Sequence, residues 1–522
     1  MKSVLNLFDL KQKVNYKNEI LSGLTVAIAL VPEAIAFAMI ADLSPLTGLY
    51  AAFSIGLITS IFGGRPGMIS GATGAVAVVY VGMITLIKKA HPEFTVDQIT
   101  QYVFATVILA GIIQILVGLL KLGKFIRLVP HPVMFGFVNG LAIIIFMAQF
   151  KSFKVGDDWM SGNDLYLMLG LVALTMGIIW GLPKLTKAVP SSLVAIIVVS
   201  GLVIGLDLDT KVVADTMNGE SMAGGFPIPQ LPSIEWNLET LEIIFPYAVI
   251  VAGVGLIESL LTLNLIDEIT QTRGSGNKEC VAQGAANITS GFFLGMGGCA
   301  MIGQSLINIS SGARARLSGI VASLGLLSFI MWGAPVIEQL PMAALVGVMF
   351  MVSIGTFEWA SFKVFGKMPW TDVVVMVVVT LITVFLENLA LAVLVGVIIS
   401  ALAFAWENAT RIRARKYIDE NGSKHYEIFG PVFFGSIEVF KEKFDVQNDP
   451  DDVIIDFSES KVADMSAIEA LNNITDRYLK AGKKVHLRHL SPDCQKLLKN
   501  ADKIIEVNVL EDPTYHVAAD NV

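Results

Sequence analysis

Residues 20–40 read ILSGLTVAIALVPEAIAFAMI, an apolar run that contains one acidic residue, Glu33. A helix needs about 20 mostly apolar residues to cross the hydrocarbon core of a bilayer. The run is long enough for that. It is too long for the apolar part of a secretory signal, and it ends in no small-residue cleavage site. We therefore expect a membrane-spanning helix here, after a polar cytoplasmic N-terminus at residues 1–19.

The same pattern continues through most of the chain. The 522 residues are 54% hydrophobic and only 16% charged, whereas soluble proteins average about 25% charged residues. Apolar runs separated by short polar loops extend to residue 408 and supply roughly 12 to 14 candidate spans. Besides the first run, the clearest candidates are residues 102–120, 134–150, 165–182, 191–206, 243–261, 320–332, 373–386 and 389–406. The sequence thus predicts an all-α polytopic transport domain in the lipid bilayer over residues 20–408. The net charge of -8 gives no nucleic-acid signal.

Lys and Arg predict the orientation, because the cytoplasmic loops of membrane proteins are enriched in these residues. With the N-terminus inside and fourteen spans, 20 of the 37 basic residues fall in inner loops and twelve in the C-terminal region. The five in outer loops are Lys88, Lys89, Lys151, Lys154 and Lys211. We therefore expect a multi-pass protein of the inner (plasma) membrane with both termini in the cytoplasm.

Two glycine-rich segments occupy corresponding halves of this region. GGRPGMISGATGA (residues 63–75) precedes a short apolar helix that reaches about Ile87, and GMGGCAMIG (residues 295–303) precedes one that reaches about Ser310. Non-helical backbone at membrane depth is tolerated only where it lines a cavity in the protein. In the expected topology the first short helix runs outward and the second inward, so their N-termini can meet near the midplane.

These two helix N-termini predict an anion site. A helix N-terminus offers free N–H donors and about half a positive charge. Two such ends that face each other can bind an anion without a cationic side chain. The alternative is that the glycines only let helices pack closely; the occurrence of two such segments in matching positions favours the anion site.

Acidic residues inside the spans are candidate functional groups, because ionisable side chains in a membrane are costly. Glu33 lies in the first span, Glu258 in the eighth, and Glu387 near the junction of the last two. Thr262 follows Glu258 by four residues, so both point from one helix face. An ionised Glu258 would repel a bound anion, and a proton or Na⁺ would remove that repulsion. We therefore expect Glu258 to couple anion transport to a cation; the alternative for each acid is a hydrogen bond to a neighbouring helix.

From Arg411 the sequence changes to the pattern of a soluble α/β protein. The predicted elements are a strand pair at residues 425–434, a buried strand at 452–457, a helix at 467–480, a strand at 484–487 and a helix that begins at Ser491. Alternating strands and helices indicate a small cytoplasmic α/β domain over residues 424–515.

Three motifs resemble those of the SulP family of sulfate permeases and related anion transporters. They are VPEAIAFA leading to LSPLTGLY (residues 31–50), SGATG (70–74) and SGARARLSG (311–319), and the resemblance extends over nearly the whole chain. It implies two inverted seven-helix repeats, at about residues 20–206 and 243–408, divided into core and gate subdomains. It also implies elevator-like alternating access and a homodimer. The C-terminal region resembles the STAS domain common at this place, which implies a cytoplasmic regulator as a partner.

The resemblance also implies a set of site residues. The implied anion-binding residues are Glu33, Thr73, Gly74, Ala75, Cys299, Ala300 and Met301. Glu258 falls where the family has an acid for coupling to Na⁺ or H⁺, and Thr262 falls where its bicarbonate transporters coordinate the cation. Many members carry Arg where this chain has Gln304, which makes the site less positive for sulfate. Bicarbonate members have Asp rather than Glu at position 258, so the sequence favours neither anion strongly.

These features favour a secondary active symporter for sulfate or bicarbonate. The alternatives are a channel-like anion conductor or exchanger and a dicarboxylate carrier on the same architecture. A buried acid in the site favours symport over conduction, and the first-span motif and the STAS-like region disfavour a nucleobase carrier.

An enzyme is not expected. The spans contain no Ser/His/Asp or metal-ligand cluster, and the chain contains no GxxxxGK[ST] motif for ATP. Cys280, Cys299 and Cys494 lack the spacing of a metal site, so we expect them to act as small apolar residues. No cofactor and no metal site are expected, apart from Na⁺ if it is the coupling ion.

Overall fold

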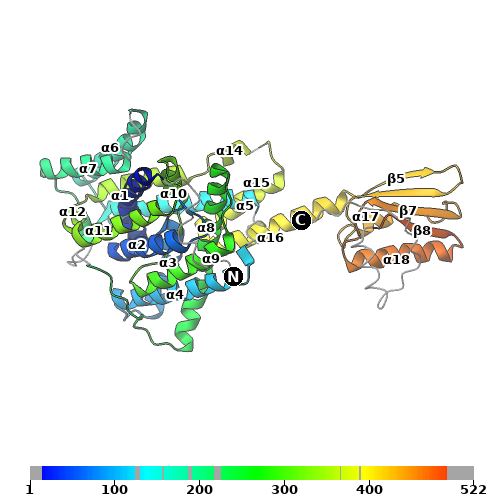
Figure 1. Ribbon diagram of the computed structural model, residues 1–522, viewed down its shortest axis with the longest axis horizontal. Helices are drawn as coiled ribbons and strands as arrows, with labels where there is room; N and C mark the ends of the chain where they lie inside the picture. The colour runs from blue at the N-terminus through cyan, green and yellow to red at the C-terminus, as the bar shows by residue number, and fades with distance from the viewer. Residues whose placement is uncertain are drawn as a thin grey trace. The chain divides into compact units, whose positions relative to one another are not determined.

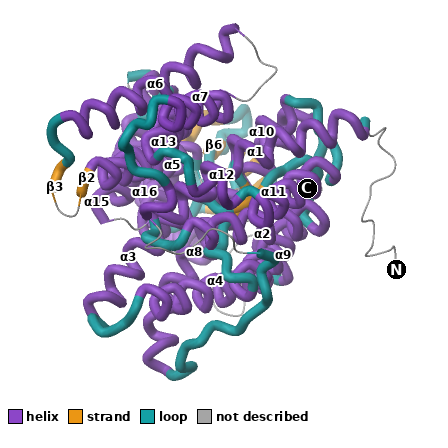
Figure 2. The backbone as a smooth tube through the Cα atoms, turned by 90° about the vertical axis from the view of Figure 1, so that its left-hand side faces the viewer, coloured by secondary structure: helices purple, strands orange, loops and turns teal. Residues whose placement is uncertain are grey.

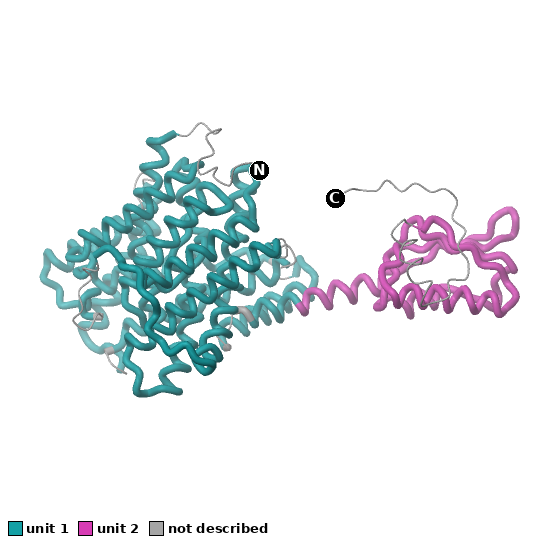
Figure 3. Tube along the Cα trace, turned by 60° about the horizontal axis from the view of Figure 1, so that its bottom comes forward, with its two compact units in different colours: residues 1–397 teal, residues 398–522 magenta. Residues whose placement is uncertain are grey.

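The computed structural model describes residues 15–123, 130–155, 158–185, 191–216, 225–364, 366–386 and 389–490. Three predicted features lie wholly or mostly outside the described residues: the polar N-terminus, Glu387 and the helix that begins at Ser491. The chain divides into two compact units, residues 1–397 and 398–522 (Figure 3). Because the division falls inside the last apolar helix, the boundaries expected at residues 408 and 424 stay predictions.

Helices make up most of the first unit (Figure 1, Figure 2). They are α1 (Tyr16–Ile40), α2 (Pro45–Phe62), α3 (Gly74–Ala90), α4 (Val96–Leu119), α5 (His131–Ala148), α6 (Asn163–Leu185), α7 (Ser191–Gly205), α8 (Leu238–Thr270), α9 (Gly276–Phe292), α10 (Ile302–Ser310), α11 (Leu317–Trp332), α12 (Ala334–Glu338), α13 (Met342–Thr356), α14 (Ala360–Val364), α15 (Trp370–Leu386) and α16 (Leu389–Thr410). The short strands are β1 (Ser70–Gly71), β2 (Lys154–Val155), β3 (Asp158–Trp159) and β4 (Cys299–Ala300), and the 3₁₀ helices are η2 (Gln149–Phe153) and η3 (Val213–Thr216).

Within the described residues, eight helical segments are long and apolar enough to cross a membrane: α1, α2, α4, α5 with η2, α6, α8, α13 with α14, and α16. Helices α7, α11 and α15 are also apolar but shorter, with 10–17 residues each. Helix α9 differs, since it consists largely of small and polar residues, and hydropathy does not single it out. It packs against α2, α4 and α8. At its crossing with α4, a Cβ on Gly284 would lie 2.5 Å from the carbonyl oxygen of Gly111, so small residues allow the close approach.

The helix contacts reveal two repeats, and they match six helices of one repeat to six of the other. Helices α1–α4 correspond to α8–α11, α5 to α13 and α6 to α15. For four contacting pairs, replacing both helices by their counterparts gives another contacting pair. The pair α4·α9 becomes α11·α2, α1·α11 becomes α8·α4, α1·α10 becomes α8·α3, and α5·α15 becomes α13·α6. Helices α1–α4 and α8–α11 form the core subdomain, and α5–α7 with α12–α16 form the gate subdomain. The fold expected from the resemblance is therefore confirmed.

The two repeats run in opposite directions through the centre of the unit. Strands β1 and β4 pair antiparallel, with Ser70 opposite Ala300 and Gly71 opposite Cys299. Each strand leads directly into a helix, α3 from the first repeat and α10 from the second. Because the strands are antiparallel, the two helices leave the pair in opposite directions.

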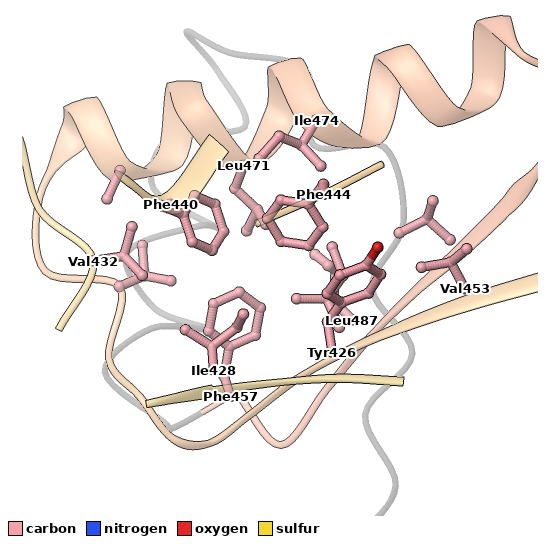
Figure 4. Packing of buried hydrophobic residues seen from close by; sticks show 14 of the residues in the cluster. Tyr426, Ile428, Val432, Phe440, Phe444, Val453, Phe457, Leu471, Ile474 and Leu487 are labelled. Carbon is pink, nitrogen blue, oxygen red and sulfur yellow. The ribbon is translucent and has the colours of Figure 1, made fainter. Parts of the chain in front are cut away.

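In its described residues, the second unit contains the end of α16, a four-stranded sheet and two further helices (Figure 1). Its elements are β5 (Arg413–Ile418), β6 (Lys424–Phe429), α17 (Ile437–Lys441), β7 (Asp452–Glu459), α18 (Met465–Lys480) and β8 (Lys484–Arg488). The strand order is β5-β6-β7-β8, with β5 antiparallel to β6 and the other neighbours parallel. Figure 4 shows Phe440 and Phe444 between α18 and the buried side chains of the sheet.

The predictions for this unit hold in part. The strands expected at residues 452–457 and 484–487 and the helix at 467–480 are confirmed. The strand pair expected within residues 425–434 is wrong in position, because the partner of β6 is β5, which precedes it. The turn between them contains Gly422 at a φ of 85°, a left-handed conformation that suits glycine.

A buried carboxylate, Asp449, joins the sheet to α18. It accepts hydrogen bonds from Lys424 Nζ, from the Tyr426 hydroxyl at 2.6 Å and from the Tyr478 hydroxyl. Burial opposes ionisation of Asp449, but the hydrogen bonds from these three side chains outweigh it and hold the pKa of Asp449 below its ordinary value.

Candidate functional site

The centre of the site is the β1–β4 pair and the two helix N-termini that follow it. The N-cap residues are Thr73 for α3 and Met301 for α10, both in extended conformations, and neither caps its helix with its side chain. The first intrahelical hydrogen bonds are donated by Ala77 and Ser305. The N–H groups of residues 74–76 and 302–304 precede those bonds. Two sets of helix N-terminal donors therefore lie next to one strand pair.

Glycines allow this close arrangement. A Cβ atom on Gly298 would lie 1.9 Å from the carbonyl oxygen of Gly71, so only glycine lets β4 approach β1 this closely. A Cβ on Gly74 would lie 2.8 Å from Ile145 Cδ1 and 2.9 Å from Phe37 Cε1. Phe37 belongs to the core helix α1 and Ile145 to the gate helix α5, so the start of α3 lies at the boundary between the subdomains.

A chain of hydrogen bonds links the α3 N-terminus to Glu258. The Thr73 hydroxyl lies 3.2 Å from the Cys299 thiol, and the thiol donates to Glu258 Oε2 at 2.9 Å. Thr73, at 2% exposure, and Cys299, at 0%, are buried. The Thr262 hydroxyl donates to the backbone oxygen of Glu258 at 2.8 Å, one turn earlier on α8. The structure thus brings together a predicted anion-binding hydroxyl and the predicted coupling acid.

Glu33 pairs with Gln304, the neutral residue that the sequence analysis singled out on α10. Gln304 Nε2 donates to Glu33 Oε1 at 2.7 Å, which joins α1 to the first turn of α10. Gln304 is 2% exposed, and its Oε1 is buried without a hydrogen-bond partner in the described structure. A neutral amide that donates to a carboxylate therefore occupies this position.

Two of the implied anion-binding residues have their backbone donors engaged already. The Ala300 N–H donates to Ser259 Oγ at 3.1 Å, and the Met301 N–H donates to the Ile69 carbonyl oxygen at 2.9 Å. The free donors at this end are therefore those of the first turn of α10. Gly303, in that turn, has no atom within 4 Å of the position of a Cβ in the described structure. Ala75, on α3, is fully buried.

Polar side chains of α9, which the sequence did not single out, hold the backbone directly before β4. The Gly298 carbonyl accepts hydrogen bonds from Gln283 Nε2 and Asn287 Nδ2, both at 3.1 Å, and its N–H donates to Asn287 Oδ1 at 2.9 Å. Asn287 also donates to Gln114 Oε1 at 2.8 Å. Gln283 and Asn287 are four residues apart on α9, a spacing that could have indicated one polar helix face.

Two buried acids were also missed. Glu19 accepts hydrogen bonds from the N–H groups of Arg314 at 2.6 Å and Ser318 at 3.0 Å, at the start of α11. Glu279, on α9, accepts from the Gly64 N–H at 2.7 Å. Both hold backbone N–H groups near helix ends, which is a structural role.

Charged residues gather at the two ends of the core. Asp42 lies 3.6 Å from Lys151 and 4.0 Å from Lys88, both expected in outer loops. Beside Asp42, a cavity of about 210 Å³ is lined by α1, α5 and α13. At the other end, Arg65 pairs with Asp267 at 3.2 Å. In the parts of the chain that the structure describes, no three His, Cys, Asp or Glu side chains gather in a way that could hold a metal ion.

Known protein families match most of this chain. Residues 16–166 and 165–379 match the profile of the sulfate permease family, and residues 417–512 match that of the STAS domain. A Bacillus subtilis protein named "Putative sulfate transporter YbaR" is 44% identical, with 95% of this chain and 99% of that protein covered. The bicarbonate transporter BicA of Picosynechococcus is 28% identical, with 91% and 88% covered.

Solved structures agree with these matches. The transmembrane domain of a cyanobacterial BicA has a TM-score of 0.62 at 30% identity and covers 74% of this chain and 98% of its own. The structure of SLC26A9 has a TM-score of 0.79 at 18% identity, with 95% and 89% covered, and shows the same fold. These named relatives are transporters, so the expectation that the chain is not an enzyme is confirmed. The chain is a multi-pass membrane protein that belongs to the sulfate permease family and carries a C-terminal STAS domain.

Proposed function

We propose that this protein is a secondary active transporter that moves sulfate or bicarbonate together with H⁺ or Na⁺. One observation carries the proposal: Glu258 is joined through Cys299 to Thr73, at the N-terminus of α3. A carboxylate in contact with an anion site makes anion binding depend on neutralisation of that carboxylate.

The charges around the site support an anion as the substrate. The N-termini of α3 and α10 each carry about half a positive charge. Two carboxylates lie close to these helix starts. Glu258 is joined to Thr73 through Cys299, and Glu33 accepts a hydrogen bond from Gln304. The two helix ends attract an anion, and a cation bound at Glu258 offsets the repulsion from its charge. Cotransport of one cation with the anion therefore lowers the cost of occupying the site.

Sulfate and bicarbonate are both candidate substrates, because the relatives include proteins named as transporters of each anion. The neutral Gln304 beside Glu33 makes this part of the site less favourable for a doubly charged anion than an Arg would. The overall resemblance to a protein named as a sulfate transporter favours sulfate. Both anions therefore enter the test.

The remaining assignments belong to the same proposal. The protein lies in the inner membrane as a homodimer, with both termini cytoplasmic. Core and gate move past each other in alternating access. The STAS domain binds a cytoplasmic regulator, and Na⁺ is a candidate coupling ion.

The test is uptake of labelled sulfate and labelled bicarbonate into proteoliposomes, with Na⁺ and pH gradients imposed separately. We expect accumulation of one anion, driven by one of the gradients, and loss of accumulation in Glu258→Gln. Glu239→Gln, at the exposed start of the same helix, is the matched control and should transport normally. Accumulation by Glu258→Gln at the wild-type level would refute the coupling role. Fast anion flux without accumulation would establish a channel-like conductor instead.

A further inference from the structure

Three side chains from separate parts of the chain form a continuous series of contacts, in which Thr73 and Cys299 are buried and Glu258 is half-buried. Thr73 precedes α3, Cys299 lies on β4 and Glu258 lies on α8. The Thr73 oxygen is 3.2 Å from the Cys299 sulfur, and either atom can be the donor in this contact. The sulfur is 2.9 Å from Glu258 Oε2. Because Cys299 and Thr73 are buried, water does not substitute for these partners readily, and the orientation of one hydrogen bond fixes that of the next.

From this geometry we propose that Cys299 is a positioning residue that transmits the protonation state of Glu258 to the Thr73 hydroxyl, and that the coupling ion is a proton. The inference rests on the proposed function and specifies how its coupling works.

The chain of hydrogen bonds can adopt two directions. An ionised carboxylate only accepts hydrogen bonds, so the thiol hydrogen points to Glu258 and the Thr73 hydroxyl hydrogen points to the sulfur. The Thr73 oxygen then presents lone pairs to its surroundings, which disfavours an anion. When a proton from solution binds Glu258 Oε2, the acid donates to the sulfur and the thiol donates to the Thr73 oxygen. The Thr73 hydroxyl hydrogen is then free to donate to an anion beside the α3 N-terminus.

This reversal conserves all atoms and moves one proton in total. The proton enters on Glu258, stays there while the anion is bound, and leaves when the anion has been released on the other side. The thiol and hydroxyl hydrogens only rotate about their C–S and C–O bonds. Proton binding and anion binding therefore reinforce each other, as reciprocal coupling between two sites requires.

The ligand chemistry favours a proton over Na⁺. Hard cations such as Na⁺ prefer oxygen ligands, whereas a thiol is a soft donor. Here the thiol occupies Glu258 Oε2, and the Thr262 hydroxyl hydrogen is directed to the Glu258 backbone oxygen. A proton fits this arrangement without moving any heavy atom.

Other ionisable groups lie on the elements around α8, but the contact that bears on the Glu258 side chain is the one with Cys299. The elements packed against α8 carry Tyr80, Lys88 and Lys89 on α3, Asp97 and Tyr102 on α4, Lys278, Glu279 and Cys280 on α9, and Cys299 on β4. Of these, Cys299 hydrogen-bonds the Glu258 side chain in the described structure. Glu279 is engaged with the Gly64 N–H. Lys88 is paired with Asp42.

The experiment measures the KM of full-length protein in proteoliposomes for labelled sulfate, or for bicarbonate if only bicarbonate is transported, as external pH is varied. For wild type, KM should fall as pH is lowered, by up to about tenfold per pH unit where Glu258 titrates. Cys299→Ala leaves the Thr73 hydroxyl hydrogen free at every pH, so it should lower KM at alkaline pH about tenfold, the effect of gaining one hydrogen bond to a charged ligand. It should also reduce the slope of log KM against pH to less than about half of the wild-type slope, with only the direct repulsion from Glu258 remaining.

Two further variants and one control separate the relay from a structural role. Cys299→Ser keeps a group that donates and accepts, so it should restore the pH slope. Thr73→Val removes the hydroxyl with little change in volume and should flatten the slope as Cys299→Ala does; it serves as the test if Cys299→Ala does not fold. Cys280→Ala removes the other described buried free cysteine and should behave as wild type.

Several outcomes would overturn the relay. A wild-type pH slope in Cys299→Ala or Thr73→Val would do so, and so would a folded Cys299→Ser that fails to restore the slope. Accumulation driven by Na⁺ and not by a pH gradient would overturn the assignment of the proton. The proposed function fails separately, if the wild-type protein accumulates neither anion under either gradient. A failure of the relay with symport intact is therefore distinguishable from a failure of symport.

Discussion

Replacing Gly298 by Ala tests whether the close approach of the two strands creates the site. A Cβ at this position would lie 1.9 Å from the Gly71 carbonyl oxygen, about 1.1 Å short of the 3.0 Å below which real Cβ contacts essentially never fall. The oxygen belongs to the backbone of β1, and the Cβ is fixed to the backbone directly before β4, so no flexible side chain can absorb the overlap. Strand β4 must therefore move away from β1.

The cost follows from the hydrogen bonds that this movement breaks. A shift of that size would lengthen the bond from the Met301 N–H to the Ile69 oxygen from 2.9 Å to about 4.0 Å, beyond hydrogen-bond range. The bond from the Ala300 N–H to Ser259 Oγ, at 3.1 Å, would be strained in the same way. Leaving two buried N–H groups unpaired costs about 2–6 kcal/mol.

The assay combines thermal unfolding of the purified protein with anion uptake into proteoliposomes. Gly298→Ala should lower the Tm and abolish uptake. Gly253→Ala is the matched control on α8, because no atom of the described structure lies within 4 Å of the added Cβ. It should leave uptake unchanged and raise helix stability by about 0.5–1 kcal/mol. A Gly298→Ala protein with wild-type Tm and uptake would refute the argument that strand contact forms the site.

Three further predictions concern other parts of the chain. Removing residues 411–522 should change the rate or the assembly of the transporter and leave its substrate choice unchanged, which competition uptake assays check; a changed selectivity would refute a regulatory STAS domain. Lys151→Ala removes one exposed partner of Asp42 and should change the free energy of unfolding by less than about 1 kcal/mol, whereas uptake measured against salt concentration should lose part of its salt dependence. Lowering the pH should weaken the STAS domain, because a carboxylate with a depressed pKa stabilises the fold above its unfolded pKa and loses that contribution as the pH falls through its folded pKa. Asp449→Ala should therefore destabilise the domain by about 3–5 kcal/mol, measured by hydrogen exchange on the full-length protein, whereas Asp476→Asn, an exposed ion-pair partner, should change it by less than about 1 kcal/mol.

The parts of the fold that depend on local sequence were predictable. Apolar length identifies the long spans, and glycine-rich backbone before short helices indicates the starts of α3 and α10. Both signals act within a few residues of the feature they describe, so one sequence suffices to detect them. The anion-binding role of those helix starts, and the coupling role of Glu258, stay predictions.

The pairing of distant residues was not predictable. Gln304 looked like a lost positive charge, whereas in the structure its amide is the partner of Glu33, which comes from the other repeat. No periodicity records such a contact. Helix α9 has little hydropathy because its neighbours, rather than lipid, surround it, and scales that measure lipid transfer do not detect this. Cys299 looked like a small apolar residue, and only its neighbours give its thiol a partner on each side.

If core and gate move past each other as proposed, the apolar contact over Gly74 affects how they do so. Ile145 of the gate and Phe37 of the core both lie against the start of α3. Apolar contacts depend on area and hardly on direction, whereas a hydrogen bond at the same place would favour one alignment. This contact therefore favours no single alignment. The apolar surface at Ile145 can slide across the N-terminus of α3 without a preferred stopping point. The stopping points of the transport cycle must then be set elsewhere, by contacts with direction such as the ion pair between Asp42 and Lys151.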